Sequence, residues 1–350
     1  MTDPKRKRQG IWLGAPSFAH GDDPWTRLHH SGANTGNLFI GHSLAKHLDA
    51  EFAPCVTVEG AHALRERCDF VAIAAANFIS PHFDMGHLAD IVEAADLPCV
   101  IAGLGAQAPR QGDEIALSEG TQRFLRAVAD RCELIGVRGA NSAQILFDYG
   151  IRNVEVTGCP SIYLAADECK PVSGDELSAL AINGSCDVVA HSLNVSRLSD
   201  VEGELYRQAM DFGADYVLQS DLLQIEIKFG GETTERLEAM KRRLPKLAHV
   251  PSDRLERFIR ENCKIFFDVS AWTSYLAGRA ASIGSRFHGN MAALHAGTPA
   301  LFICHDARTS ELCQFARLPH LSLSEVVVPR GVVYELKGAN ASEASSGNRR

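Results

Sequence analysis

Residues 280–306 read AASIGSRFHGNMAALHAGTPALFICHD, and this stretch decides the fold. An apolar run stops at SRFHG (285–289), a short amphipathic run follows, and a second apolar run starts after Gly297-Thr298-Pro299. Short apolar runs bounded by glycine and proline are typical of buried strands, and the run between them is typical of a helix. The pattern predicts strand, turn, helix and strand, with Arg286 and His288 where the first strand ends.

The same alternation of short apolar runs with longer helical patterns continues along the chain. The runs expected to be strands lie at 10–16, 53–60, 70–79, 98–107, 132–139, 154–161, 187–195, 214–220, 264–270, 281–285 and 300–306. Between them lie helical patterns, as where Ile40, Leu44 and Leu48 recur every four residues. Strands that alternate with helices form parallel sheets covered on both faces. We predict an α/β protein of two Rossmann-like domains facing across a cleft.

A polar connection at 165–186 separates the two units. We therefore expect an N-terminal domain at 10–170 and a C-terminal domain at 186–337. The basic start of the chain is predicted to be a disordered leader at 1–9. The polar, low-complexity end is predicted to be a disordered tail at 338–350.

The composition is that of a soluble globular protein of 350 residues, with 45% hydrophobic and 22% charged residues. A net charge of −8 excludes a general attraction to nucleic acid. The ten cysteines are scattered singly, which predicts a reduced, cytoplasmic chain without zinc. No apolar run is long enough for a membrane helix. The KRKR run at 5–8 is expected to be solvated, with contact to the inner membrane face as the alternative.

Ligands of such sheets bind beyond the carboxyl ends of the strands, where helix N-termini favour anions. Polar residues directly after strands are therefore the candidates for a site. Ser285, Arg286 and His288 meet this rule, because Arg286 can bind an anion with two hydrogen bonds and His288 can donate or transfer a proton. The alternative is structural: an arginine that binds a neighbouring carbonyl and a histidine satisfied by the backbone.

Four segments resemble the polysaccharide pyruvyl transferase family. IGSRFHGNMAALHAGTPALFICHD (283–306) is similar to its C-terminal Arg-x-His-Gly signature, and GLGAQAP (103–109) to a glycine-rich turn. LIGVRGANSAQILFDYGIRNVEVTGCPS (134–161) is similar to its strand–Arg–helix segment, and NTGNLFIG (34–41) to its Asn-x-Gly-Asp turn. The resemblance covers about residues 31 to 316.

The resemblance implies a fold like that of GT-B glycosyltransferases, phosphoenolpyruvate as donor, and a pair of sugar hydroxyls as acceptor, joined as a pyruvate ketal. By motif match, Arg138, Arg286 and His288 hold the donor. Two arginines across the cleft would bind its phosphate and carboxylate. His288 is the candidate acid for the methylene carbon, since this carbon must be protonated before a hydroxyl attacks.

Other residues near these motifs have two interpretations each. Asp306 is either a base facing the cleft or a helix N-cap. Asn34 and Gly36 either bind donor or begin a helix, and Gln107 either contacts ligand or caps. Further candidate donor contacts are Gly289 and Asn37, while His29 and His30 are expected to be loop surface.

Two positions depart from the family pattern. Asn37 stands where the family carries aspartate and cannot act as a base, so Asp22 or Asp23 would have to replace it, or the chemistry is altered. The segment GCPS at 158–161 stands where relatives usually carry an acidic residue. Both departures bear on activity more than on fold.

The sequence leaves two rivals to pyruvyl transfer: a GT-B glycosyltransferase that uses a nucleotide sugar, and a non-catalytic relative that binds a sugar or anion. We expect no cofactor and no tightly bound metal, because no His, Cys or carboxylate cluster has ligand spacing. The expected partners are phosphoenolpyruvate and a saccharide, with a lipid-linked saccharide as one form. The acceptor sugar, the ketal stereochemistry and the oligomeric state stay open.

Overall fold

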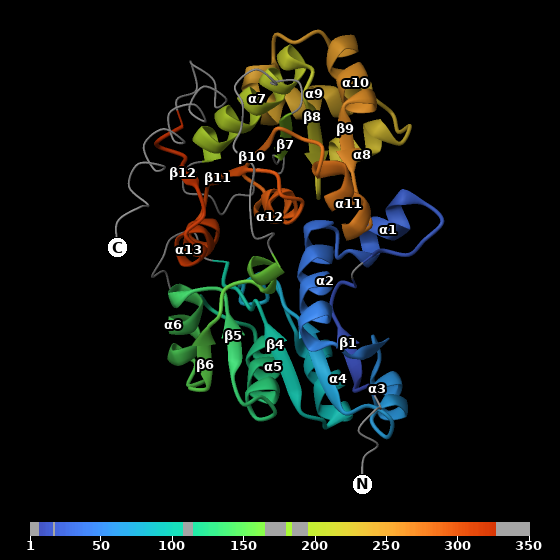
Figure 1. Ribbon diagram of the computed structural model, residues 1–350, viewed down its shortest axis with the longest axis vertical. Helices are drawn as coiled ribbons and strands as arrows, with labels where there is room; N and C mark the ends of the chain where they lie inside the picture. The colour runs from blue at the N-terminus through green and yellow to red at the C-terminus, as the bar shows by residue number, and fades with distance from the viewer. Residues whose placement is uncertain (1–6, 17, 108–114, 165–179, 184–194, 327–350) are drawn as a thin grey trace.

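The chain folds into two α/β domains, the N-terminal one below the C-terminal one in Figure 1. The computed structural model describes residues 7–16, 18–107, 115–164, 180–183 and 195–326. The predicted tail, most of the predicted leader and most of the strand predicted at 187–195 lie outside these residues. Among the described helices, none is both long and apolar enough to cross a bilayer.

The N-terminal domain has a parallel sheet with strand order β2-β1-β3-β4. A bridge from Leu104 to Val137 continues it into the parallel pair β5-β6. The elements are β1 (Gln9–Leu13), α1 (Pro24–His30), α2 (Gly36–Leu48), β2 (Glu51–Pro54), α3 (Val58–Leu64), β3 (Phe70–Ala74), α4 (Gly86–Ala95), β4 (Cys99–Ala102), α5 (Glu119–Ala129), β5 (Ile135–Val137), α6 (Ala140–Asp148), β6 (Val154–Val156) and the 3₁₀ turn η1 (Pro160–Leu164).

The C-terminal domain has six parallel strands in the order β12-β11-β10-β7-β8-β9. Counted within the domain this is 6-5-4-1-2-3, the Rossmann order. The elements are β7 (Leu180–Asn183), α7 (Val195–Phe212), β8 (Asp215–Leu218), α8 (Leu222–Lys228), α9 (Thr234–Arg243), η3 (Pro245–Leu247), α10 (Ser252–Glu261), β9 (Cys263–Ile265), α11 (Val269–Leu276), β10 (Ala281–Gly284), α12 (Phe287–His295), β11 (Ala300–Cys304), α13 (Ala307–Ala316) and β12 (His320–Ser322).

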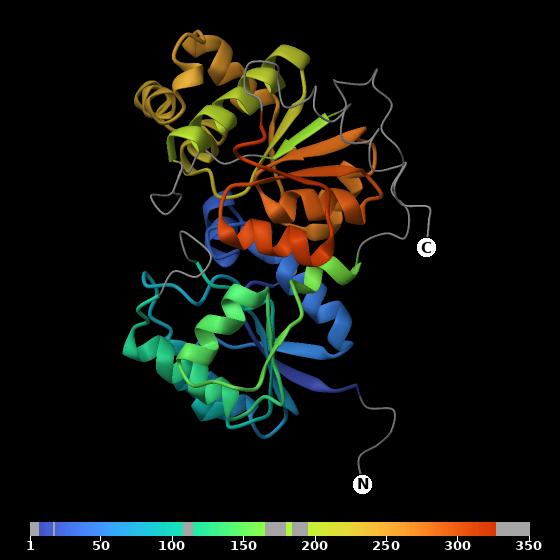
Figure 2. The same cartoon turned by 90° about the vertical axis from the view of Figure 1, so that its left-hand side faces the viewer.

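Successive side chains of a strand point to opposite faces of the sheet, so the apolar residues of one strand belong to two different cores. In β1, Ile11 and Leu13 belong to the core under α4 and α5, while Trp12 faces the opposite way. The core on that opposite side contains residues of both domains, including Phe39 of α2 and Met291 of α12. The domains are thus joined by buried apolar contacts, with α2 and α13 at their junction (Figures 1 and 2).

Several predicted boundaries differ from the structure, and three of them have a clear reason. The strand predicted at 53–60 ends at Pro54, because the Thr57 side chain accepts a hydrogen bond from the Gly60 amide and begins α3. The strand predicted at 264–270 ends at Ile265, since Asp268 caps α11. The second sheet includes β7, which pairs with β10 and β8, so it begins before residue 186.

Candidate active site

Each sheet has a point where the strand order reverses, and both points open onto the junction between the domains. In the C-terminal sheet the reversal lies between β7 and β10, and Arg286 follows β10. In the N-terminal sheet it lies between β1 and β3, and Asn77 follows β3. Ligands of open α/β sheets bind at such reversals, so two binding regions face each other here.

The side chain of Asn290 holds the turn that carries Arg286 and His288. The Asn290 amide donates to the carbonyls of Gly284 at 2.9 Å and Leu301 at 3.1 Å, and so ties the turn to β10 and β11. Phe287 packs its ring against Phe302, with ring centroids 5.3 Å apart. The residues on either side of Phe287 are left to face the cleft.

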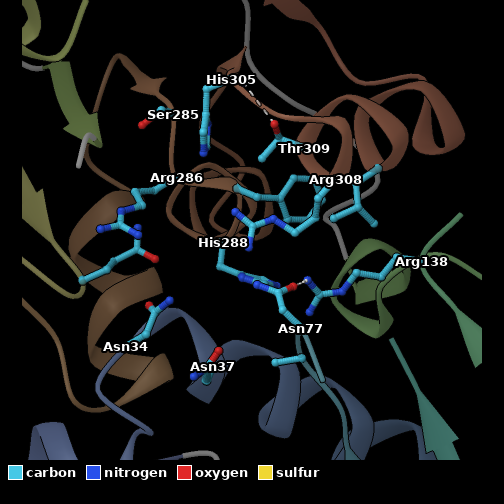
Figure 3. A pocket seen from close by; sticks show the side chains of 14 residues that line it. Asn34, Asn37, Asn77, Arg138, Ser285, Arg286, His288, His305, Arg308 and Thr309 are labelled. Atoms are coloured by element: carbon cyan, nitrogen blue, oxygen red, sulfur yellow. Dashed lines mark hydrogen bonds between the residues drawn. The ribbon is translucent and has the colours of Figure 1, made fainter. Parts of the chain in front are cut away.

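A cavity that is open to solvent lies between the domains, with about 540 Å³ of empty space including its mouth, and is called the first cavity. Three arginines, Arg138, Arg286 and Arg308, reach it from both domains, together with His288 and His305 (Figure 3). Its remaining lining residues are Asn34, Asn37, Ala76, Asn77, Gln219, Ser285, Phe287, Thr309 and Leu312. Guanidinium groups on both walls suit a small anion with more than one charged group.

Arg138 follows β5 and is only 3% exposed. Its Nε donates to the Gly103 carbonyl at 2.7 Å, and its Nη1 donates to Asn77 Oδ1 at 2.7 Å. Its Nη2 is buried without a hydrogen-bond partner in the part of the chain that the structure describes. Within that part it also forms no ion pair with a carboxylate. A buried guanidinium in this state favours an anionic ligand.

The two cavity-lining arginines of the C-terminal domain are each paired with an aspartate. Arg286 donates to Ser220 Oγ at 2.6 Å and lies 3.5 Å from Asp221 Oδ1. Arg308 lies 2.9 Å from Asp306 Oδ2. These contacts hold both guanidinium groups at the cavity wall before any ligand arrives.

His288 reaches the cavity from the first turn of α12. Burial, followed by the positive charges of Arg138 and Arg308, lowers the pKa of His288 well below its ordinary value. The ring is therefore neutral at pH 7 in the free protein. Its Nε2 lies 3.4 Å from the Sγ of Cys159, which in turn accepts a hydrogen bond from Ser161 Oγ at 3.2 Å.

Asp306 is the N-cap of α13, which is one of the two interpretations given for it above. Its carboxylate accepts from the Thr309 amide at 2.8 Å and caps α13, and it does not line the first cavity. Burial opposes its ionisation, but Arg308, His305 and the hydrogen bonds from Thr309 outweigh this and hold the pKa of Asp306 below its usual range. A carboxylate with a lowered pKa is a weak base. The predicted role of Asp306 as a catalytic base stays a prediction.

Three candidate residues lie at the start of α2. Asn34 lines the cavity, and its Oδ1 also accepts from the Gly36 amide at 2.9 Å, so it combines both interpretations. Gly36 does not line the cavity; a Cβ there would lie 2.5 Å from Gln219 Oε1 and 3.3 Å from His288 Cβ. Glycine at this position allows the close approach of the domains. Asn37 lines the cavity and donates its amide to the Ser31 carbonyl at 3.1 Å.

A larger cavity, the second cavity, adjoins the first on the side of the N-terminal domain, with about 1030 Å³ of empty space including its mouth. Gln107 lines this cavity, as do His29 and His30, which end α1. The two cavities share Asn34, Asn37, Ala76 and Asn77. The other lining residues are Gly14, Ala15, Gly32, Ala74, Phe78, Phe83 and Met85.

Two further candidates, Ser285 and Gly289, are buried, and their predicted donor contacts stay predictions. Ser285 lines the first cavity, but its hydroxyl donates to the buried Glu202. Gly289 is buried inside α12 and does not line either cavity. No cluster of three or more His, Cys, Asp or Glu residues suited to a metal occurs in the described ranges.

Sequence analysis did not single out Asn77, Gln219 or Arg308. Asn77 and Gln219 follow β3 and β8, so the strand-end rule that selected Arg286 would have found them if it had been applied to every strand. Arg308 lies in the first turn of α13 and carries no such signal.

Two Rossmann-like domains with an arginine-lined cavity between them define a GT-B-like protein. The family model for polysaccharide pyruvyl transferases matches residues 22–306. The chain belongs to this family of transferases.

No curated protein matches the chain. Among solved structures it is similar to a putative UDP-N-acetylglucosamine 2-epimerase from Listeria monocytogenes, with 10% identity, a TM-score of 0.45, and coverage of 97% of this chain and 89% of that chain. It is also similar to UDP-GlcNAc 2-epimerase from Neisseria meningitidis bound to UDP-GlcNAc, with 9% identity, a TM-score of 0.44, and coverage of 97% and 93%. The glycosyltransferase SnogD from Streptomyces nogalater has 14% identity, a TM-score of 0.33, and coverage of 96% of each chain.

Proposed function

We propose that this protein transfers the pyruvate unit of phosphoenolpyruvate to two hydroxyls of a saccharide, forming a ketal and releasing phosphate. The observation that carries the proposal is the Arg138 guanidinium, which is buried, forms no ion pair among the described residues, and has an unpaired Nη2. Family membership supports pyruvyl transfer in general, and this cation supports an anionic donor in particular.

The first cavity suits the two charged groups of the donor. Arg138 lies on the wall of the N-terminal domain, and Arg286 and Arg308 lie opposite it (Figure 3). A phosphate and a carboxylate on one small molecule would bind guanidinium groups from both domains at once. Donor binding would thereby link the two domains, since Arg138 belongs to one of them and Arg286 and Arg308 belong to the other.

The reaction balances with one acid and one base. His288 gives a proton to the methylene carbon while a sugar hydroxyl bonds to the adjacent carbon and loses its own proton. The carbon–oxygen bond to phosphate then breaks, and the second hydroxyl bonds to the same carbon. Its proton leaves with the phosphate, so one hydroxyl proton ends on the new methyl group and the other on hydrogen phosphate.

The charge state of His288 fits this sequence of events. In the free protein its ring is neutral, because burial and the neighbouring arginines lower its pKa. A bound trianion offsets the arginine charges and raises that pKa. Donor binding therefore favours the protonated form of His288.

The test is thermal unfolding with phosphoenolpyruvate at millimolar concentration, compared with several UDP-sugars. We expect phosphoenolpyruvate to raise the Tm of the wild type and to leave Arg138→Ala unshifted. Arg123→Ala is the matched control, because Arg123 is a half-exposed arginine paired with Asp90 and Glu93. A Tm that rises with UDP-sugars and not with phosphoenolpyruvate would favour the glycosyltransferase. A Tm that responds equally in wild type and Arg138→Ala would refute the donor site.

A further inference from the structure

The second cavity lies at the strand-order reversal of the N-terminal sheet. Gly14 and Ala15 follow β1, and Asn77 and Phe78 follow β3, and all four line it. It meets the first cavity along a wall that includes Asn34, Asn37 and Asn77. A molecule bound here would therefore lie next to a donor bound in the first cavity.

The chemistry of this cavity differs from that of the first. Among its described lining residues there is no Lys, Arg, Asp or Glu. Phe78, Phe83 and Met85 supply apolar surface, and Gln107 and the asparagines supply neutral hydrogen-bonding groups. Such a lining suits an uncharged ligand with apolar faces and many hydroxyls.

We propose that the second cavity binds the acceptor saccharide and that His30 is the base that takes the proton of its attacking hydroxyl. The inference rests on the proposed function. It assigns to His30 the role of base, which Asn37 cannot fill. Asn37 has no carboxylate, and its amide is engaged as a donor to the Ser31 carbonyl. A base must therefore come from another residue on the acceptor side of the donor.

The ring of His30 is held in the tautomer that a base requires. Its Nδ1 lies 2.8 Å from the carbonyl oxygen of His20. A carbonyl oxygen only accepts hydrogen bonds, so Nδ1 carries the hydrogen and Nε2 carries the lone pair. His29 also lines the cavity, but within the described residues its ring has no such anchor. His30 is thus an oriented imidazole beside the acceptor site.

Two histidines then carry the proton transfers on opposite sides of the donor. His30 Nε2 takes the proton of the first hydroxyl as its oxygen bonds to the central carbon of phosphoenolpyruvate. His288 gives its proton to the methylene carbon in the same addition. After the phosphate has left, His30 loses its proton to solvent, and His288 gains a proton again when the next phosphoenolpyruvate binds.

The test does not require a known acceptor. Permeabilised cells of the source strain with the gene deleted supply the natural acceptor, and purified variants are added with phosphoenolpyruvate. The readout is acid-releasable pyruvate in the polysaccharide. The variants are His30→Gln, His30→Ala, and His87→Gln as the matched control, since exposed His87 also binds a backbone carbonyl, that of Val56 at 2.8 Å, and lines neither cavity.

We expect His30→Gln to incorporate pyruvate about 10²-fold more slowly or worse, as for loss of a general base. Its Tm shift with phosphoenolpyruvate should equal that of the wild type, and His87→Gln should match the wild type in both measurements. Added imidazole should restore part of the rate to His30→Ala, which a purely structural role would not allow.

The inference would be overturned if His30→Gln incorporated pyruvate at the wild-type rate. It would also be overturned if His29→Gln lost incorporation while His30→Gln kept it. Wild-type protein that neither responds to phosphoenolpyruvate nor incorporates pyruvate would instead refute the proposed function. The two failures are therefore distinguishable.

Discussion

The Sγ of Cys159 lies 3.4 Å from the Nε2 of His288, although 129 residues separate them along the chain. Ser161 donates to the same sulfur, which leaves the thiol hydrogen for the imidazole nitrogen. Cys159 thus gives the histidine a thiol as its hydrogen-bonding partner.

We predict that Cys159→Asp shifts the pH optimum of transfer upward. A carboxylate beside His288 stabilises the imidazolium and raises the pKa of His288. The acid form then persists to higher pH, so the falling limb of the pH–rate profile moves to higher pH. Cys159→Ser keeps a neutral hydrogen-bonding partner and should leave the profile in place. An unchanged profile in Cys159→Asp would show that the pair has no influence on the acid.

Binding of phosphoenolpyruvate should take up protons near pH 7. His288 is neutral in the free protein because burial and the two nearby arginines lower its pKa. A trianion in the cavity raises that pKa, so the ring gains a proton on binding. Calorimetry in buffers of different ionisation enthalpy measures this uptake directly. His288→Gln should abolish it; the same uptake in that variant would assign the proton elsewhere.

His288→Gln should separate binding from turnover. Glutamine keeps hydrogen bonding and approximate size but cannot deliver a proton, so kcat should fall by about 10²-fold or more while donor affinity holds. Turnover and donor affinity are measured on the same preparation, with the pyruvylated sugar as product. If turnover at saturation is intact and affinity is lost, His288 is a binding contact only.

Arg286→Ala should weaken donor binding without unfolding the protein. Its guanidinium is held by Ser220 and by the buried Asp221, so the cavity loses one charged wall while the turn itself is kept by Asn290. We expect the Tm shift with phosphoenolpyruvate to disappear and the unfolding transition to stay cooperative. Equal shifts in mutant and wild type would remove Arg286 from the donor site.

Glu311 of α13 holds the two domains together. Its carboxylate accepts from the Asn141 amide at 2.9 Å and from Ser142 Oγ at 3.3 Å, at the N-terminus of α6. Burial raises the pKa of Glu311 despite these donors. Glu311→Ala should lower the free energy of unfolding by about 1 kcal/mol, as for loss of a helix cap.

The loosened junction in Glu311→Ala should also weaken donor binding and enlarge the radius of gyration measured by small-angle scattering. Urea denaturation gives the stability, and Glu66→Ala is the control, because the Glu66 side chain is 85% exposed. A radius and donor affinity equal to the wild type would show that Glu311 caps α6 without closing the cleft.

Local pattern was sufficient for the elements that position Arg286 and His288. The strand, turn and helix at 281–295 depend on neighbouring residues: apolar alternation for β10, Asn290 for the turn, and Phe287 for the packing of α12. The two α/β domains follow from the same alternation repeated along the chain. The boundaries at 53–60 and 264–270 were wrong because a side-chain cap ended each apolar run earlier than its hydrophobicity did.

By itself, then, the sequence determined the class of fold, the family and the residues at the ends of the strands, since each of these is written in short stretches of chain. The tertiary structure alone decided which of those residues meet. Packing of α2 against α12 brings Asn34 beside His288, and Arg138 reaches Asn77 across 61 positions of sequence. Capping of α13 occupies Asp306, and the end of α1 carries His30 to the second cavity. The contact between Asn34 and His288 depends on how the two domains pack, and the contact between Arg138 and Asn77 depends on how the strands of one domain are arranged. No local pattern of hydrophobic residues encodes either arrangement.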